Sequence, residues 1–97
     1  MRTFFLLFGL FTMSSFIHAS EIPFYLGTYT KDTTSKGIYL SRLDAVTGKF
    51  SPATLAGECL NPGFLAFSPD RKFLYAAMED KESAVAAFRV NPDRSLT

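Results

Sequence analysis

The 97-residue chain has few of the residues that bind metals or form crosslinks. It contains one histidine, His18, and one cysteine, Cys59. A single cysteine cannot form a disulfide within the chain, and apolar neighbours predict that Cys59 is a buried, unreactive thiol. The sequence also has no glycine-rich phosphate loop, no paired cysteines at metal-ligand spacing and no nucleophile elbow. We therefore expect neither a metal ion nor another cofactor.

No hydrophobic run in the sequence is long enough to cross a membrane. The longest covers residues 4–13, whereas a spanning helix needs about 20 apolar residues. This run follows Arg2 and precedes the small residue Ala19, an arrangement typical of a secretory signal peptide over residues 1–19. We expect export to the periplasm or the cell exterior and no membrane association after cleavage. An uncleaved membrane anchor is the alternative.

Residues 20–97 carry no excess of either charge. The whole chain has ten lysines and arginines against nine acidic residues, and Arg2 accounts for the difference. A neutral surface argues against a nucleic-acid or anionic-membrane partner. His18 lies in the predicted signal peptide, so the remainder offers no imidazole for metal binding, acid–base catalysis or a catalytic triad. Such chemistry is expected only beyond Thr97.

After the predicted signal peptide, short β-rich segments alternate with turn residues, and no segment shows sustained helical spacing. This pattern indicates an all-β fold. The turn chemistry of residues 68–72 further predicts a hairpin between the strands on either side of it. The alanines of the last segment would also permit a helix. Strands are predicted over residues 24–30, 37–43, 49–56, 64–67, 73–78 and 84–90.

An internal repeat connects these segments. Arg42 and the turn after it resemble Arg89 and the turn after it, and Tyr25 corresponds to Tyr75. A repeat of roughly 40 to 50 residues with several short strands is typical of β-propeller blades, and a small β-sandwich is the alternative. Because one blade cannot bury both of its faces, residues 20–97 alone are expected to fold poorly.

Several short motifs follow one another along the chain: Tyr25 to Thr30, Gly37 to Tyr39, Arg42 to Asp44, Asn61 to Ala66, Ser68 to Asp70, Phe73 to Ala76, Glu79, and Ala87 to Val90. In combination and order, these motifs resemble the lactonase family of seven-bladed β-propellers. That family includes 6-phosphogluconolactonase and, more distantly, the carboxymuconate cyclases. The resemblance implies that residues 20–97 form roughly the first one and a half blades, as a truncated N-terminal part, with the second blade beginning at Asn61.

The chain departs from the family pattern at three positions. Arg71 and Arg94 each follow Pro-Asp, where the family usually has glycine. If the backbone there is left-handed, each arginine should cost roughly 1 kcal/mol. The alternative is that the two turns are reshaped. Met78 stands where relatives often carry asparagine, which argues against a polar role at that position.

The resemblance implies a lactonase that hydrolyses a sugar lactone without a metal, with the lactone as its small-molecule partner. This reaction needs a base to activate water and donors to stabilise an oxyanion. In the related cyclases, the acting histidine, arginine and glutamate lie in later blades, so the catalytic residues are expected beyond Thr97 and the chain alone should be inactive. A non-catalytic exported propeller that binds a glycan or a protein is the alternative.

Within the chain, Glu79 is the best-placed candidate site residue. It follows a predicted inner strand and could project onto one mouth of the central channel that the blades of a propeller surround. Tyr29 and Thr30 are expected near the same rim. The alternatives are a solvated loop carboxylate for Glu79 and ordinary strand-end packing for Tyr29 and Thr30.

Overall fold

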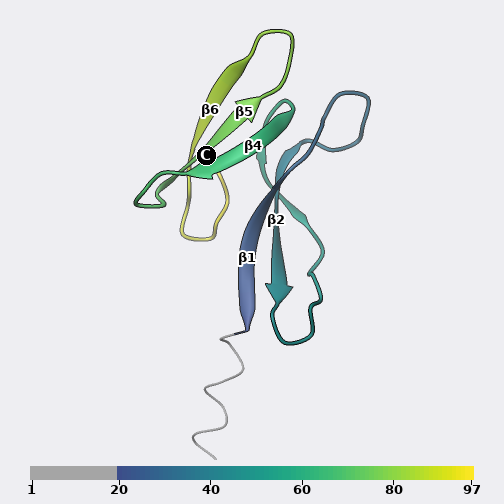
Figure 1. Ribbon diagram of the computed structural model, residues 1–97, viewed down its shortest axis with the longest axis vertical. Helices are drawn as coiled ribbons and strands as arrows, with labels where there is room; N and C mark the ends of the chain where they lie inside the picture. The colour runs from purple at the N-terminus through teal and green to yellow at the C-terminus, as the bar shows by residue number, and fades with distance from the viewer. Residues whose placement is uncertain (1–19) are drawn as a thin grey trace, which may run out of the picture.

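The structure is a computed structural model that describes residues 20–97; the predicted signal peptide lies outside the described residues. It contains two antiparallel three-stranded sheets, whose strand order follows the chain (Figure 1). No helix occurs between residues 20 and 97, which confirms the all-β prediction. The first sheet holds β1 (Glu21–Gly27), β2 (Gly37–Asp44) and β3 (Thr54–Glu58), and the second holds β4 (Pro62–Phe67), β5 (Phe73–Met78) and β6 (Ala84–Arg89).

The described part of the chain has no helix of the length and apolarity needed to span a membrane.

Strand boundaries agree closely with the sequence-based prediction for β2, β5 and β6, and the alanine-rich β6 is a strand rather than a helix. The predicted hairpin between β4 and β5 is confirmed. The prediction was wrong for β1, which begins and ends three residues earlier than expected. It was also wrong for β3, which begins at Thr54 because the chain from Phe50 makes only an isolated bridge to Leu43 before pairing resumes.

The two sheets repeat one another in register. Tyr25 pairs with Leu40 across β1 and β2, as Tyr75 pairs with Ala87 across β5 and β6. After each of these pairs of strands an isolated bridge continues the ladder, from Leu43 to Phe50 and from Val90 to Leu96. Strand β4 therefore has no counterpart in the first sheet. This arrangement agrees with the expectation that a new blade begins at Asn61.

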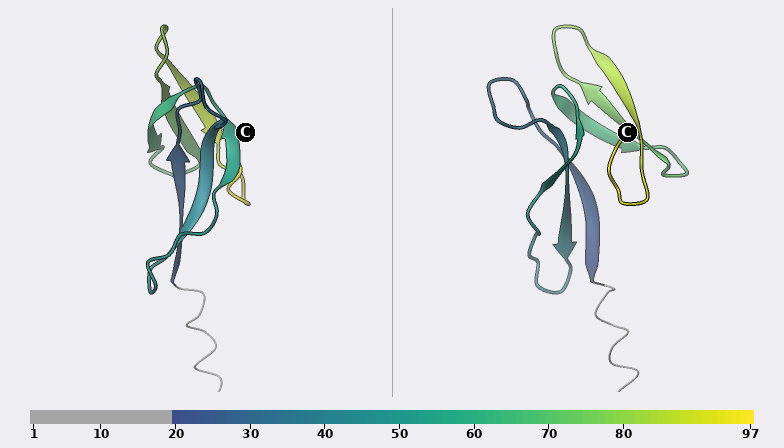
Figure 2. Two further views of the ribbon diagram at one scale, coloured as in Figure 1. Left: turned by 90° about the vertical axis from the view of Figure 1, so that its right-hand side faces the viewer. Right: turned by 180° about the vertical axis from the view of Figure 1, so that it is seen from behind.

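The core lies where the two sheets pack against each other (Figure 2). Ile38 from the first sheet joins Leu74 and Ala76 from the second in one buried cluster. The backbone N–H of Leu96 also donates a hydrogen bond to the carbonyl of Ala56 at 2.9 Å, which links the end of the described chain to β3. Partly buried residues around the cluster are Tyr25, Cys59, Leu65, Ala86, Phe88, Val90 and Leu96.

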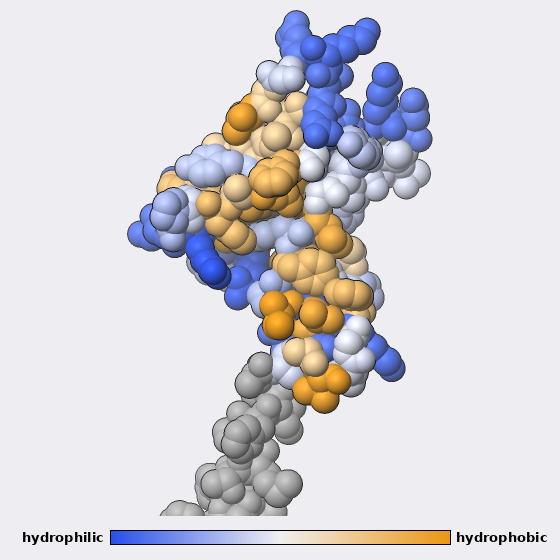
Figure 3. Space-filling view, viewed as in Figure 1, coloured by the Kyte–Doolittle hydropathy of each residue, from blue (hydrophilic) through white to orange (hydrophobic). Residues whose placement is uncertain are grey.

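The faces of the sheets that point away from this core are also apolar. Phe50 is 66% exposed on the first sheet, and Phe64 and Val85 are 70% and 73% exposed on the second. Hydrophobic surface runs over both sheets in the space-filling view (Figure 3). Each sheet therefore has two apolar faces, of which only one is covered by described residues.

Both arginines that replace family glycines adopt left-handed backbone conformations, with φ of 61° at Arg71 and 71° at Arg94. The first turn is held by Ser68, whose hydroxyl donates to Asp70 at 2.7 Å and accepts from the N–H of Phe73 at 3.1 Å. The expected turn geometry is thus retained without glycine.

Candidate functional site

Three chain segments meet at one end of the two sheets: the end of β1, the start of β4 and the end of β5. Gly27 brings the first two together, because a Cβ at this position would overlap the carbonyl oxygen of Pro62. The polar side chains that follow these strand ends therefore come from both sheets and lie close together.

Asn61 organises this junction. Its side-chain oxygen accepts hydrogen bonds from the backbone N–H of Thr30 at 2.8 Å and of Lys31 at 3.2 Å. Its own N–H donates to the Thr30 hydroxyl at 3.2 Å. Asn61 is only 7% exposed, and its φ is 43°, a left-handed value that asparagine tolerates better than most residues. It thus caps the loop that leaves the first sheet while it begins the second.

Glu79 lies beside Asn61, and its backbone N–H donates to the Asn61 carbonyl at 2.9 Å. The Tyr29 hydroxyl donates to Oε2 of the Glu79 carboxylate at 2.8 Å, so this bond joins the two sheets. The hydrogen bond, together with the negative charge of Glu79, raises the pKa of Tyr29 above its usual 10.0. Both side chains face solvent.

Gly63 leaves the space that the Glu79 carboxyl group fills. A Cβ at Gly63 would overlap that group, and glycine therefore allows the carboxylate to lie against the start of β4. A small cavity of about 90 Å³ opens next to it, lined by Gly27, Thr28, Tyr29, Pro62 and Gly63.

The structure brings the predicted site residues Glu79, Tyr29 and Thr30 into one junction. Glu79 and Tyr29 are paired directly, whereas Thr30 is hydrogen-bonded to Asn61. The sequence analysis identified Asn61 only as the start of the second blade and missed its capping role. The signal was present, since asparagine in turns commonly accepts hydrogen bonds from nearby backbone and tolerates left-handed conformations.

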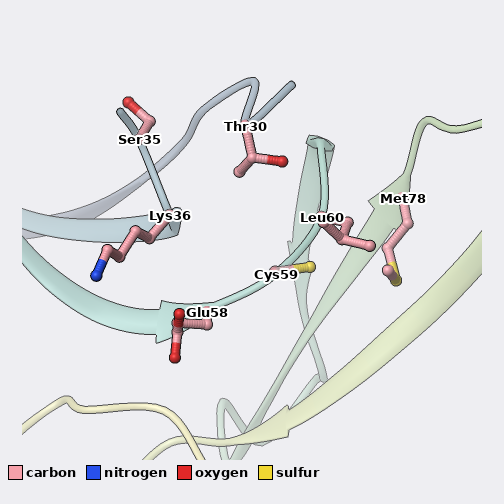
Figure 4. Close-up of a pocket in the computed structure, with 7 residues that line it drawn as sticks. All are labelled: Thr30, Ser35, Lys36, Glu58, Cys59, Leu60 and Met78. Atoms are coloured by element: carbon pink, nitrogen blue, oxygen red, sulfur yellow. The ribbon is translucent and has the colours of Figure 1, made fainter. Parts of the chain in front are cut away.

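A second hollow, of about 500 Å³, lies between the ends of β3 and β5 and contains Cys59 (Figure 4). Cys59 is partly rather than fully buried and packs against the Ile38 cluster. Burial raises the pKa of its thiol, which keeps the sulfur protonated and a weak nucleophile. Met78 also lines this hollow, so the position where relatives often carry asparagine is apolar here.

Among residues 20–97 no three His, Cys, Asp or Glu side chains are grouped closely enough to hold a metal ion. Within that part of the chain, the junction supplies a carboxylate acceptor and a phenol. It supplies binding groups rather than a complete hydrolytic centre.

Two register-matched sheets that pack on each other and keep apolar outer faces are the arrangement of neighbouring blades in a β-propeller. The family model described as lactonase, 7-bladed beta-propeller, matches residues 23–97. The chain therefore belongs to this lactonase family, and it forms part of a seven-bladed propeller. The family to which the motifs pointed in the sequence is thus confirmed.

Two solved structures are similar to the chain, and both come from proteins provisionally assigned as 6-phosphogluconolactonases. The protein from Bacteroides fragilis is 32% identical with a TM-score of 0.69, over 84% of this chain and 24% of that one. The protein from Bacteroides uniformis is 30% identical with a TM-score of 0.66, over 80% of this chain and 24% of that one. The chain thus spans about a quarter of each neighbour. No curated protein matches it.

Proposed function

We propose that the complete gene product is an exported lactonase that hydrolyses a sugar lactone without a metal cofactor. The observation that supports this most is the match of the lactonase family over residues 23–97. The phosphorylated lactone named for the neighbouring structures is a charged intermediate of cytosolic metabolism. An exported relative is therefore expected to act on a different, uncharged sugar lactone.

We assign the described junction to substrate binding rather than to bond cleavage. The Glu79 carboxylate is exposed, and among residues 20–97 Tyr29 is its only side-chain hydrogen-bond donor. Its remaining lone pairs are suited to accept hydrogen bonds from sugar hydroxyls, while Tyr29 fixes its orientation. In this proposal, the base that activates water and the oxyanion donors belong to residues beyond Thr97.

The lactonase activity is tested on the complete gene product. Acid release from gluconolactone and related unphosphorylated lactones is followed by pH-stat titration, with heat-inactivated protein as the control for spontaneous hydrolysis. The proposal expects release well above that control. Release no faster than the control would reject a lactonase and favour a propeller that binds a glycan or a protein.

The role of Glu79 is tested with Glu79→Gln and the matched control Glu82→Gln, a nearby exposed carboxylate on the same loop. Glu79→Gln is expected to raise KM for gluconolactone several-fold with little change in kcat, because a binding contact is weakened before the chemical step. The control should leave both constants unchanged. A fall in kcat at constant KM would place Glu79 in the chemical step instead.

Export is tested by the mass of the protein recovered outside the cytoplasm. Cleavage after Ala19 should give a mature chain that begins at Ser20. Recovery of an uncleaved protein in the membrane fraction would support the anchor alternative.

A further inference from the structure

Another cavity lies between the two sheets, away from the junction at Asn61. Its volume is about 310 Å³, and its lining comes from the first half of β1, the end of β4 and the turns that follow β4 and β6. Figures 1 and 2 show the turn after β6, drawn in yellow, beside β1. Among residues 20–97, the cavity shares no lining residue with the Glu79 site.

Most of the cavity wall is apolar. The Tyr25 ring lies 5.8 Å from the Phe67 ring in a tilted arrangement. The Tyr25 hydroxyl donates a hydrogen bond to the backbone carbonyl of Arg94 at 2.6 Å, which fixes this aromatic wall in place. A concave apolar surface of this kind is suited to the hydrocarbon part of a small molecule. The rest of the apolar wall consists of Pro23, Leu40 and Val90.

Two arginines, Arg71 and Arg94, bring positive charge to this cavity. The Arg71 guanidinium lies 6.0 Å from the centre of the Phe67 ring, so it is held against the aromatic wall. Burial raises the pKa of Tyr25, the charge of Arg94 opposes this rise, and the charge of Asp93 adds to it. Both arginine charges therefore act at the aromatic side of the cavity.

The acidic residue next to each arginine is bound within its own turn. Asp70 accepts hydrogen bonds from the Ser68 hydroxyl at 2.7 Å and from the N–H of Lys72 at 3.0 Å. Asp93 accepts from the hydroxyl and the N–H of Ser95 at 2.6 Å and 3.0 Å. These hydrogen bonds lower the pKa of both carboxyl groups. The two carboxylates thus serve the turns, which leaves the arginine charges available to another anion.

The backbone at both arginines is unfavourable for a residue with a side chain. The φ angles of 61° at Arg71 and 71° at Arg94 are left-handed values that glycine would adopt without cost. Residues held in such conformations are concentrated at binding sites and active sites. Two strained arginines on the same cavity therefore point to a binding role for their side chains.

We propose that this cavity binds a small organic anion, namely a carboxylate attached to an apolar or aromatic body. Arg71 and Arg94 bind the carboxylate, because a guanidinium donates two parallel hydrogen bonds to such a group. The apolar body lies against the walls formed by Tyr25 and Phe67. An inorganic anion fits less well, since it has no apolar surface to bury there. The site is separate from the Glu79 junction and does not depend on lactonase activity.

The proposal is tested by calorimetric titration of the complete gene product with benzoate at fixed ionic strength. Benzamide and inorganic phosphate are the comparison ligands. Benzoate should bind at one site and more tightly than either, because only benzoate combines a negative charge with an apolar ring. No saturable binding of benzoate would overturn the proposal, as it would if residues beyond Thr97 filled the cavity. Equally tight binding of benzamide or of phosphate would also overturn it.

The role of the arginines is tested with Arg71→Gln and Arg94→Gln. Each variant should weaken benzoate binding about tenfold, because it loses charge-assisted hydrogen bonds to the carboxylate. Lys72→Gln is the matched control, since it removes the same charge from the turn of Arg71 at a position that does not line the cavity. Its affinity for benzoate should be unchanged. Equal weakening in all three variants would show that benzoate responds only to net charge, which would overturn the proposal.

A second measurement needs no variant. Phenylglyoxal modifies accessible arginines in the complete protein, and peptide mapping identifies which positions have reacted. Saturating benzoate should protect Arg71 and Arg94. Arg89, which lies over the Phe73 ring and outside the cavity, should react equally with and without benzoate. Unchanged modification of Arg71 and Arg94 would place bound benzoate elsewhere and overturn the proposal.

Discussion

The side-chain oxygen of Asn61 lies 2.8 Å from the backbone nitrogen of Thr30. Asn61, which immediately precedes β4 of the second sheet, thus caps the loop that follows β1 of the first sheet. Replacing Asn61 by alanine would leave the N–H groups of Thr30 and Lys31 without this acceptor. We expect Asn61→Ala to lower the free energy of unfolding of the complete protein by about 1–3 kcal/mol. Denaturant unfolding measures the effect. Asn61→Asp is the control, because it keeps the acceptor, and equal losses in both variants would contradict the capping role.

Gly27 and Gly63 are predicted to respond differently to the same substitution. Gly27→Ala places a methyl group against the backbone carbonyl of Pro62, which cannot move without separating the sheets. Gly63→Ala places it against the end of the flexible Glu79 side chain, which can turn away. Thermal denaturation should therefore show a large loss of stability for Gly27→Ala and a small one for Gly63→Ala. The reverse order would contradict the described approach of β1 to β4.

Gly63→Ala should nevertheless alter the proposed substrate-binding site. Displacing the Glu79 carboxylate breaks its hydrogen bond from Tyr29. If the complete protein hydrolyses a lactone as proposed, its KM should therefore rise, as is expected for Glu79→Gln. An unchanged KM in Gly63→Ala, combined with a raised KM in Glu79→Gln, would show that Glu79 does not need this position.

Replacing Arg94 by glycine is expected to stabilise the protein. Its φ of 71° is a left-handed value that carries a cost of roughly 1 kcal/mol for a residue with a side chain. Part of the gain is lost to the greater freedom of glycine in the unfolded chain. The Tyr25 hydrogen bond is kept, since its acceptor is a backbone carbonyl. Arg94→Gly should raise the Tm, and a lowered Tm would contradict the turn geometry.

Arg71→Gly should raise the Tm less than Arg94→Gly does, although both substitutions replace an arginine whose backbone is left-handed. The Arg71 guanidinium lies 6.0 Å from the centre of the Phe67 ring, and this cation–π contact would be lost. Comparing the two Tm shifts measures the difference.

The bond between Tyr29 and Glu79 predicts a pH dependence at the alkaline end. The hydrogen bond to Glu79 raises the pKa of Tyr29 above 10.0, the usual value expected in the unfolded chain. The stabilisation is therefore complete below pH 10 and is lost as the pH rises through the folded-state pKa. NMR titration of ¹³C-labelled tyrosine should show the pKa of Tyr29 falling toward 10 in Glu79→Gln. An equal pKa in both proteins would contradict the pairing.

Local sequence patterns predicted most of the fold because strands such as β5 have strong β-forming residues between clear turn signals. They failed at β1, where the sequence through Thr30 favours a strand but the strand ends at Gly27. The backbone of Thr30 and Lys31 is hydrogen-bonded to Asn61 instead of to a neighbouring strand. That partner is 31 positions away in the chain, so no local pattern contains it.

The candidate site could be predicted only in part for the same reason. The position of Glu79 after a strand placed it at the end of a sheet, and the structure confirms that location. Its partner Tyr29 lies 50 positions earlier, and the space for its carboxylate depends on the missing side chain of Gly63. Both facts follow from how the two sheets pack, which the strand pattern alone does not specify.

The apolar outer faces of the two sheets are expected to need further blades to cover them. Among residues 20–97, Ile38, Leu74 and Pro62 are the largest side chains that are fully buried, which is a small core for two sheets. Thermal unfolding of a purified polypeptide of residues 20–97, followed by circular dichroism and sedimentation, tests this claim most directly. We predict no cooperative transition from a monomer, whereas a sharp transition from a compact monomer would contradict the account.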